Sequence, residues 1–329
     1  MKGLRKKALV LAAVTVFAMS SLAGCSRDYT VDNDKVAVKV GDSEISLGVL
    51  NFYLRYNQAD IEEAYAQSLG TDFWKTQIAE GITFEDNQKE STINALTQMY
   101  ILEDHMSEFG VEVTSEELTA IEKAADDFIA ANAENSSLVS GDKEIIQEVL
   151  RMATISTKMY MAMIEDVSTE VSDFEAAQKK LAYLGFTETE NVTLEEAKAE
   201  AELFLEDAKK KGDLMELAKE QQAPSHEFTF DSKTTTISKK IVEAADKLKA
   251  GEFADIIEDG KIYYVVQLIS EFDKDATQAK KDQIVADRQT EKFESLYKPW
   301  QDATEIVIDD SVVADISLHG LQVKPITKK

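Results

Sequence analysis

Few side chains in this sequence are suited to covalent or metal chemistry. Its 329 residues include one cysteine, Cys25, and three histidines, His105, His226 and His319. A single cysteine allows no disulfide within the chain and no thiolate metal cluster. The histidines are also too far apart for the short ligand spacings of zinc sites. The sequence therefore predicts no metal and no cofactor.

His226 lies between Ser225 and Glu227, and these are the residue types of a hydrolase triad. In known triads the three groups are brought together by the fold, because side chains adjacent in sequence rarely converge. We therefore interpret His226 as a solvated loop residue.

Cys25 follows a segment with the order of a secretory signal. Basic residues at positions 2, 5, 6 and 7 precede an uncharged apolar run from Ala8 to Met19. This run is shorter than the ~20 residues that a spanning helix needs. Leu22–Cys25 resembles the bacterial lipobox, in which the leader is cut before an acylated cysteine. The resemblance predicts a signal peptide at 1–24 and a lipid anchor at Cys25, on the extracytoplasmic face of the cell membrane. The alternative is an ordinary cleavage site beside a spare thiol.

The charge of the chain argues against nucleic acid as a partner. Acidic residues outnumber basic ones 62 to 36, and loss of the leader would change the net charge from −26 to −30. Such a surface repels phosphate backbones and anionic head groups. The apolar fraction of 44% is nevertheless that of a globular protein with a real core.

The pattern predicts a mostly helical α+β protein. Only three prolines occur, and long stretches are rich in Ala, Glu, Lys and Leu. After a polar spacer at 25–35, a strand is expected at 36–40, with Ser46 capping the next helix. Another helix is expected from about Gln88 until Gly110 stops it. Thr114 and Glu117 then have the spacing of a capping box.

A helix predicted over 143–165 carries an unusual group of methionines, namely Met152, Met159, Met161 and Met163. One interpretation is that they fill gaps between core helices. The other is that some of them, with Met152, Met159 and Met163 as candidates, line an adaptable apolar cleft, since the flexible thioether repacks against varied partners.

Residues 171–275 have a different pattern. Strands are predicted at 180–186 and 262–268, with helices between them at 194–211, 214–221 and 239–249. This order suggests a compact α+β domain of about 100 residues. A further helix at 280–300 and a β-rich tail at 305–308 follow, and the tail has no core of its own.

Three passages are similar to the chaperone domain of the PrsA and SurA group of extracytoplasmic foldases: Val36–Leu54, Phe109–Leu118 and Gln289–Ile308. The middle of the chain resembles a parvulin-type prolyl isomerase at Ala197–Leu217 and Ala244–Glu252. The resemblance implies a chaperone domain built from 36–170 and 276–322, with a parvulin-like domain inserted at 171–275.

The same resemblance predicts a membrane-anchored foldase whose partners are unfolded exported polypeptides; it leaves the oligomeric state open. The isomerase site of the family has a histidine in its first strand and another in its last, where this chain has Tyr183 and Tyr264. Ile237 and Ile241 stand where the family has the Met and Phe of the proline pocket. We therefore expect a degenerate isomerase site. The alternatives are an active peptidyl-prolyl isomerase that uses the two tyrosines, and a solute-binding lipoprotein.

Overall fold

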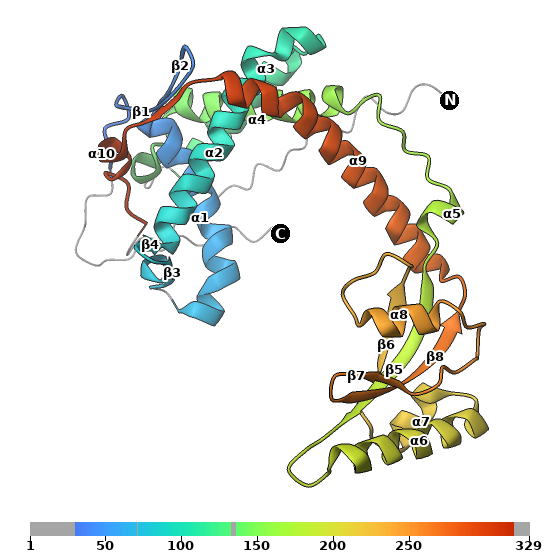
Figure 1. The fold of residues 1–329 in the computed structure, drawn as a ribbon. Helices are drawn as coiled ribbons and strands as arrows, with labels where there is room; N and C mark the ends of the chain where they lie inside the picture. Colours follow the sequence, from blue (N-terminus) through green and yellow to red (C-terminus); the bar gives the residue numbers. More distant parts are fainter. Residues whose placement is uncertain (1–29, 71, 133–135, 319–329) are drawn as a thin grey trace. The chain divides into compact units, whose positions relative to one another are not determined.

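The computed structural model describes residues 30–70, 72–132 and 136–318 (Figure 1). Its contacts divide the chain into two units. The helical unit consists of Met1–Asp166 and Lys292–Lys329, and the sheet unit consists of Val167–Glu291. The boundary at 291/292 falls inside the long helix α9 (Lys274–Ala303), 16 residues after the end of the predicted inserted domain. The predicted class, a mostly helical α+β protein with a central sheet domain, is confirmed.

The helical unit packs its main helices around one core, to which both of its chain segments contribute. Its elements are β1 (Val36–Val40), β2 (Ser43–Ser46), α1 (Leu47–Leu69), β3 (Gln77–Ala79), β4 (Ile82–Thr83), α2 (Phe84–Asp104), α3 (Ser115–Ala131), α4 (Lys143–Met163), part of α9, β9 (Ile306–Ile308) and α10 (Asp310–Val313). Short 3-10 turns lie at Phe73–Lys75, Met106–Phe109 and Ser136–Val139.

Capping side chains explain where two of these helices begin. Thr83 precedes α2 and Thr114 precedes α3, and each hydroxyl accepts a hydrogen bond from the backbone N–H three residues later. The carboxylates of Asp86 and Glu117 bond back to the threonine N–H groups, which completes both capping boxes. The predicted box at Thr114 is thus confirmed. Gly110 ends the preceding turn in the left-handed conformation, with φ 62°, which glycine adopts without strain.

A three-stranded antiparallel sheet with the order β2-β1-β9 joins the two ends of the helical unit. In β9, Ile306 pairs with Val40 and Ile308 pairs with Val38. The tail predicted to have no core of its own therefore completes a sheet that begins at residue 36. The segment after β9 adds Ile316 and Leu318 to the core.

Two cations from the helices hold that last described segment in place. Arg55 of α1 is 1% exposed and donates a hydrogen bond to the carbonyl of Ser317 at 2.6 Å. Lys89 of α2 donates to the carbonyl of Ile316 and pairs with Glu85 at 2.8 Å. Charge-assisted hydrogen bonds of this kind are stronger than neutral ones. The C-terminal segment is therefore anchored by polar contacts as well as by apolar burial.

The sheet unit is a four-stranded antiparallel sheet with the order β6-β5-β8-β7. Its elements are α5 (Asp173–Ala176), β5 (Lys179–Thr187), α6 (Leu194–Lys211), α7 (Leu214–Glu220), β6 (His226–Phe230), α8 (Lys239–Ala245), β7 (Ile257–Asp259), β8 (Ile262–Ser270) and the first part of α9. Helices α6 and α7 pack on one face of the sheet, and α8 packs on the other (Figure 1).

Two strands of this sheet differ from the sequence prediction. His226–Phe230, whose first residue was interpreted above as a loop residue, forms β6 and pairs with β5. Ile257–Asp259, where no strand was predicted, forms β7 and pairs with β8. Both are short strands at the edges of the sheet, so pairing with a longer neighbour stabilises them more than their own composition does.

No helix in the described ranges is both long enough and apolar enough to cross a membrane. The residues placed there also form no cluster of three or more His, Cys, Asp or Glu side chains that could hold a metal ion.

Candidate functional site

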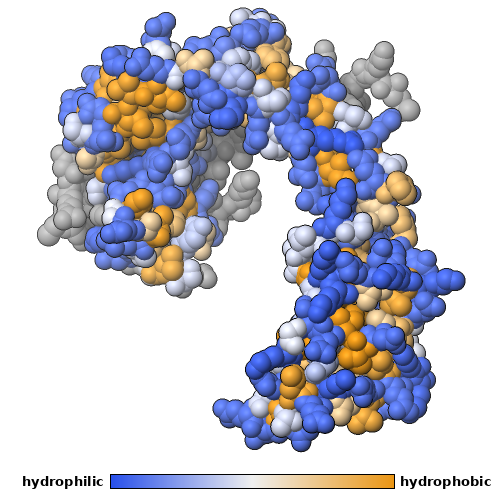
Figure 2. All heavy atoms as spheres, in the orientation of Figure 1, coloured by the Kyte–Doolittle hydropathy of each residue, from blue (hydrophilic) through white to orange (hydrophobic). Residues whose placement is uncertain are grey.

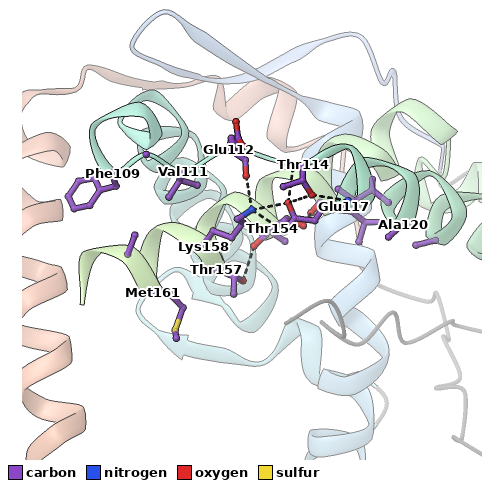
Figure 3. A pocket seen from close by; sticks show the side chains of 16 residues that line it. Phe109, Val111, Glu112, Thr114, Glu117, Ala120, Thr154, Thr157, Lys158 and Met161 are labelled. Carbon is purple, nitrogen blue, oxygen red and sulfur yellow. Dashed lines mark hydrogen bonds and ion pairs between the residues drawn. The ribbon is translucent and has the colours of Figure 1, made fainter. Parts of the chain in front are cut away.

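A groove of about 530 Å³ lies in the helical unit between α3 and α4 (Figure 3). The turn from Phe109 to Thr114, which connects α2 to α3, closes one side of it. Apolar and small residues make up most of its lining: Phe109, Val111, Ala120, Ile121, Ala124, Leu150, Ala153, Met161 and Ala162. The groove is therefore a mainly apolar depression on a helical surface.

Small side chains on both helices explain why the surface is hollow here. On α3, Ala120 and Ala124 are one helical turn apart, so they share a face. On α4, Ala153 and Thr157 have the same spacing. The opposite face of α4 carries large buried residues, including Met152, Ile155 and Met159. Because the helices pack through their large residues, the small ones leave space between them.

Lys158 is the central polar group of the groove. Its Nζ donates to the backbone carbonyl of Glu112 at 2.6 Å and to both carboxylate oxygens of Glu117, at 3.0 and 2.8 Å (Figure 3). Burial by itself raises the pKa of Glu117, but the hydrogen bonds from Lys158 and from the Thr114 N–H outweigh it, so the pKa lies below its ordinary value. The bridge from Lys158 to Glu117 thus ties α4 to the start of α3.

The methionines of α4 take two different positions. Met152, Met159 and Met163 are fully or almost fully buried in the core of the helical unit, which is where the gap-filling interpretation puts them. They line no accessible surface. Met161, on the other face of the helix, is 49% exposed and lines the groove. The helical periodicity of the core residues places 161 on the outer face, and this signal was available in the sequence.

The residues predicted for the isomerase site come together on one face of the sheet unit. Tyr183 of β5 and Tyr264 of β8 have ring centroids 6.2 Å apart, and the ring of His226 lies 5.5 Å from Tyr183. Ile241 is buried in the core below, and Ile237 is partly buried against the same core. His226 pairs directly with Tyr183 across the strands, so it lies in a strand of this sheet and not in the predicted loop, while its side chain is exposed to solvent as predicted.

Burial raises the pKa of the Tyr264 hydroxyl, and the negative charge of Asp259 raises it further. Asp259 also accepts a hydrogen bond from Ser238 at 2.6 Å. The face therefore holds neutral hydroxyl groups next to an apolar floor, an arrangement that can bind a ring and orient a carbonyl by hydrogen bonding. Sequence reasoning did not identify His226, Ser238 or Asp259 as parts of this face.

Cys25, the predicted lipidation site, and His319 lie outside the described residues. His105 lies in the helical unit, where its ring stacks on Trp300 at a centroid distance of 4.1 Å.

Residues 1–170, about half of the chain, match the SurA-like N-terminal domain family. The chain belongs to this family. The resemblance inferred above from Val36–Leu54 and Phe109–Leu118 is thereby confirmed. The SurA-like match includes all of α1 to α4, and so it contains the whole groove.

The SurA-like chain also has relatives that are similar over most of its length. The foldase protein PrsA of Lactococcus lactis subsp. lactis (strain IL1403) is 25% identical over 283 residues, which cover 82% of this chain and 79% of that protein. The crystal structure of PrsA from Lactococcus lactis matches with a TM-score of 0.34 and 17% identity, over 86% of this chain and 98% of the other. PrsA from Streptococcus pneumoniae matches with a TM-score of 0.31 and 20% identity, over 74% and 98%.

Proposed function

We propose that this protein is a membrane-anchored extracytoplasmic chaperone that holds unfolded exported polypeptides in the groove between α3 and α4. The anchor is a lipid on Cys25, and the sheet unit is a parvulin-like domain with a degenerate isomerase site. The single observation that carries the proposal is an open apolar groove inside the region that matches the SurA-like family. The relative PrsA, a foldase protein by name, supports the same activity.

The groove suits a chaperone because it is apolar without being shaped for one ligand. It lies open on the surface, and its flexible Met161 side chain can repack against different guests. An unfolded chain exposes apolar side chains one after another, and each gains free energy when it leaves water. Selectivity for a fixed sequence would instead require several placed polar groups. The groove therefore favours binding of many apolar segments with modest affinity.

Suppression of aggregation tests this proposal. The full mature chain, with and without Met161→Gln, is added to a denatured model protein that aggregates on dilution, and light scattering is followed. The wild-type chain should suppress scattering, and Met161→Gln should need a higher concentration for the same effect. Leu69→Gln is the matched control, since Leu69 is 50% exposed on α1 and does not line the groove.

Two results would count against this function. One is a wild-type chain that leaves aggregation unchanged at a severalfold molar excess. The other is equal loss of suppression in Met161→Gln and Leu69→Gln, which would show that general surface hydrophobicity matters and the groove does not. Circular dichroism of each variant checks that the fold is intact.

An active isomerase is the second candidate, and the shared face of Tyr183, His226 and Tyr264 is the observation that favours it. An uncatalysed X-Pro bond takes tens of seconds to isomerise at 25 °C. A proline tetrapeptide assay on the wild-type chain, Tyr183→Phe and Tyr264→Phe would measure the rate. Acceleration that both substitutions abolish would establish this activity and overturn the proposed degeneracy. A wild-type rate equal to the uncatalysed one would leave the sheet unit as a binding module.

A further inference from the structure

β9 has an exposed apolar edge that lies outside the proposed groove. Three consecutive β-branched residues, Ile306, Val307 and Ile308, are 38%, 50% and 42% exposed. β9 is the last strand in the order β2-β1-β9, so within residues 30–318 as the structure describes them only the side of β9 that faces β1 is paired. Figure 2 shows an apolar patch where the chain runs from α9 to α10.

The register shows which backbone groups of β9 face outward. The Gly41 N–H donates to the Glu305 carbonyl, and the Asp309 N–H donates to the Ala37 carbonyl. Backbone groups alternate along an antiparallel strand, so Val307 also faces β1, and Ile306 and Ile308 present their N–H and C=O groups to the other side. We call this side, from Ile306 to Ile308, the β9 edge. Such unpaired edges are templates for a further strand.

Acidic residues flank the β9 edge at both ends. Glu305 precedes it, Asp309 and Asp310 follow it, and all three are exposed. The carboxylate of Asp309 stays in place because it accepts hydrogen bonds from the backbone N–H groups of Ser311 and Val312 at the start of α10. The Ser311 hydroxyl donates a further hydrogen bond, which has the largest effect, and together these bonds hold the pKa of Asp309 below its ordinary value. Asp309 therefore stays negative at neutral pH.

Neighbouring lysines offset only part of this charge, because each is paired most closely with another carboxylate, although the charge of Lys35 also acts on Asp309. Lys39, which lies opposite Val307, pairs with Glu44 at 3.0 Å, and Lys35 pairs with Asp315 at 2.8 Å.

The flanking charges decide between the possible occupants. A second copy of β9 could pair antiparallel about Val307, with Ile306 opposite Ile308 of the copy. This register would place Glu305 opposite Asp309 of the copy at both ends, and like charges directly opposite are destabilising. A strand with an apolar centre and basic residues on either side would meet the same positions with opposite charge. The edge thus disfavours a second copy and fits a basic-flanked partner.

We propose that the β9 edge binds an extended apolar segment flanked by Lys or Arg residues of an unfolded polypeptide, as an added antiparallel strand. Main-chain hydrogen bonds to Ile306 and Ile308 provide affinity without a fixed sequence, and the acidic flanks provide the preference for basic segments. The source of the segment rests on the proposed chaperone function. The edge itself is separate from the groove, since none of its residues lines it.

Charge-reversed peptides test the preference. The probes are a fluorescein-labelled peptide of alternating valine and threonine with two lysines at each end, and the same peptide with glutamates instead. The wild-type chain should bind the lysine peptide more tightly. Glu305→Lys with Asp310→Lys should weaken that binding by roughly two- to thirtyfold, as the loss of two opposite-charge pairs implies, and should strengthen binding of the glutamate peptide. Asp287→Lys, an exposed acid of α9 in the sheet unit, is the matched control.

Hydrogen exchange locates the bound peptide. The lysine peptide should slow amide exchange at Ile306 and Ile308 and leave Val307, which already pairs with β1, unchanged. Protection confined to α3 and α4 would overturn the β9 proposal and support the groove. The opposite outcome combines two results: the peptide protects β9 of the wild-type chain, and Met161→Gln suppresses aggregation as well as the wild type does. That outcome would support binding at the β9 edge and reject binding in the groove. The two proposals therefore fail separately.

The single variant Glu305→Lys tests the exclusion of a second copy. In the self-paired register the substituted lysine side chain would lie opposite Asp309 of the copy, which removes the repulsion at both ends. Sedimentation at high protein concentration should then give a larger mass than the wild-type chain, and Asp287→Lys should not. A Glu305→Lys chain that keeps the wild-type mass would overturn the argument that charge excludes the copy.

Discussion

Filling the groove with side chains of the protein itself is the sharpest perturbation of the proposed chaperone site. Ala120→Leu places a branched side chain on the α3 wall of a groove whose volume is about 530 Å³. Leucine and alanine have similar helix propensities, so α3 should form as before. The added side chain occupies space that a guest side chain would otherwise take.

The expected loss of affinity follows from the burial of one guest side chain. Full burial of a Leu, Ile or Phe side chain stabilises by about 1.5–3 kcal/mol. The groove is open to solvent, as the half-exposed Met161 on its lining indicates, so a guest buries about half of that surface. The loss is then about 0.75–1.5 kcal/mol, which corresponds to a Kd weakened roughly three- to thirteenfold.

Fluorescence anisotropy with a labelled, permanently unfolded polypeptide measures this Kd. Ala130→Leu provides the control, because Ala130 is a residue of the same helix outside the groove. Thermal unfolding of both variants should stay close to that of the wild-type chain. If Ala120→Leu binds the polypeptide as tightly as Ala130→Leu and both unfold like the wild type, the groove does not bind clients.

Three further predictions concern stability and attachment. Glu117→Gln should lower the free energy of unfolding by about 0.2–1 kcal/mol near neutral pH, since it removes the charge paired with Lys158. The pKa of Glu117 is depressed in the folded protein, so the contribution of its charge to stability is complete above the ordinary value of 4.5 and is lost as the pH falls below it. Urea titrations of the wild-type chain and of Glu117→Gln should therefore converge in acid. Lys89→Met should cost about 1–3 kcal/mol in the same titration, because the Ile316 carbonyl loses its donor, and an unchanged midpoint would contradict the anchoring role. Cys25→Ser should move the protein from the membrane fraction to the soluble fraction of cells, and retention in the membrane would refute the lipid anchor.

Local sequence signals predicted the helices of this fold well, because their ends are encoded by a few residues. The helix expected at 194–211 occurs as α6 with those bounds, after the Thr193 capping box. The Thr114 box was equally local. The helix expected to reach Gly110 ends earlier, at Asp104, and Gly110 ends the 3-10 turn that follows it. Strands β6 and β7 were missed because their stability comes from pairing with β5 and β8, which are distant in sequence.

The groove was harder to predict than the helices that form it. A methionine group suggested an adaptable surface, but Met152, Met159 and Met163 are in the core and only Met161 lines the groove. Whether a helix face is covered depends on which other elements pack against it in the folded protein, and the sequence of that helix alone does not show which elements these are. The spacing of Ala120 and Ala124 was the available local signal, since two small residues on one helix face leave space for a side chain of another molecule.

The β1–β9 pairing has a consequence for the order in which the protein acquires its structure. The chain emerges N-terminus first, from the ribosome and during export alike, and residues whose partners emerge late must wait for them. β1 cannot gain β9, and α1 cannot bind the Ser317 carbonyl, until residues 306–317 have been made. When synthesis reaches residue 291, all residues of the sheet unit are present, whereas the helical unit still lacks the core residues that follow residue 291. Residues 167–291 should therefore become protease-resistant while the nascent helical unit is still open to cleavage.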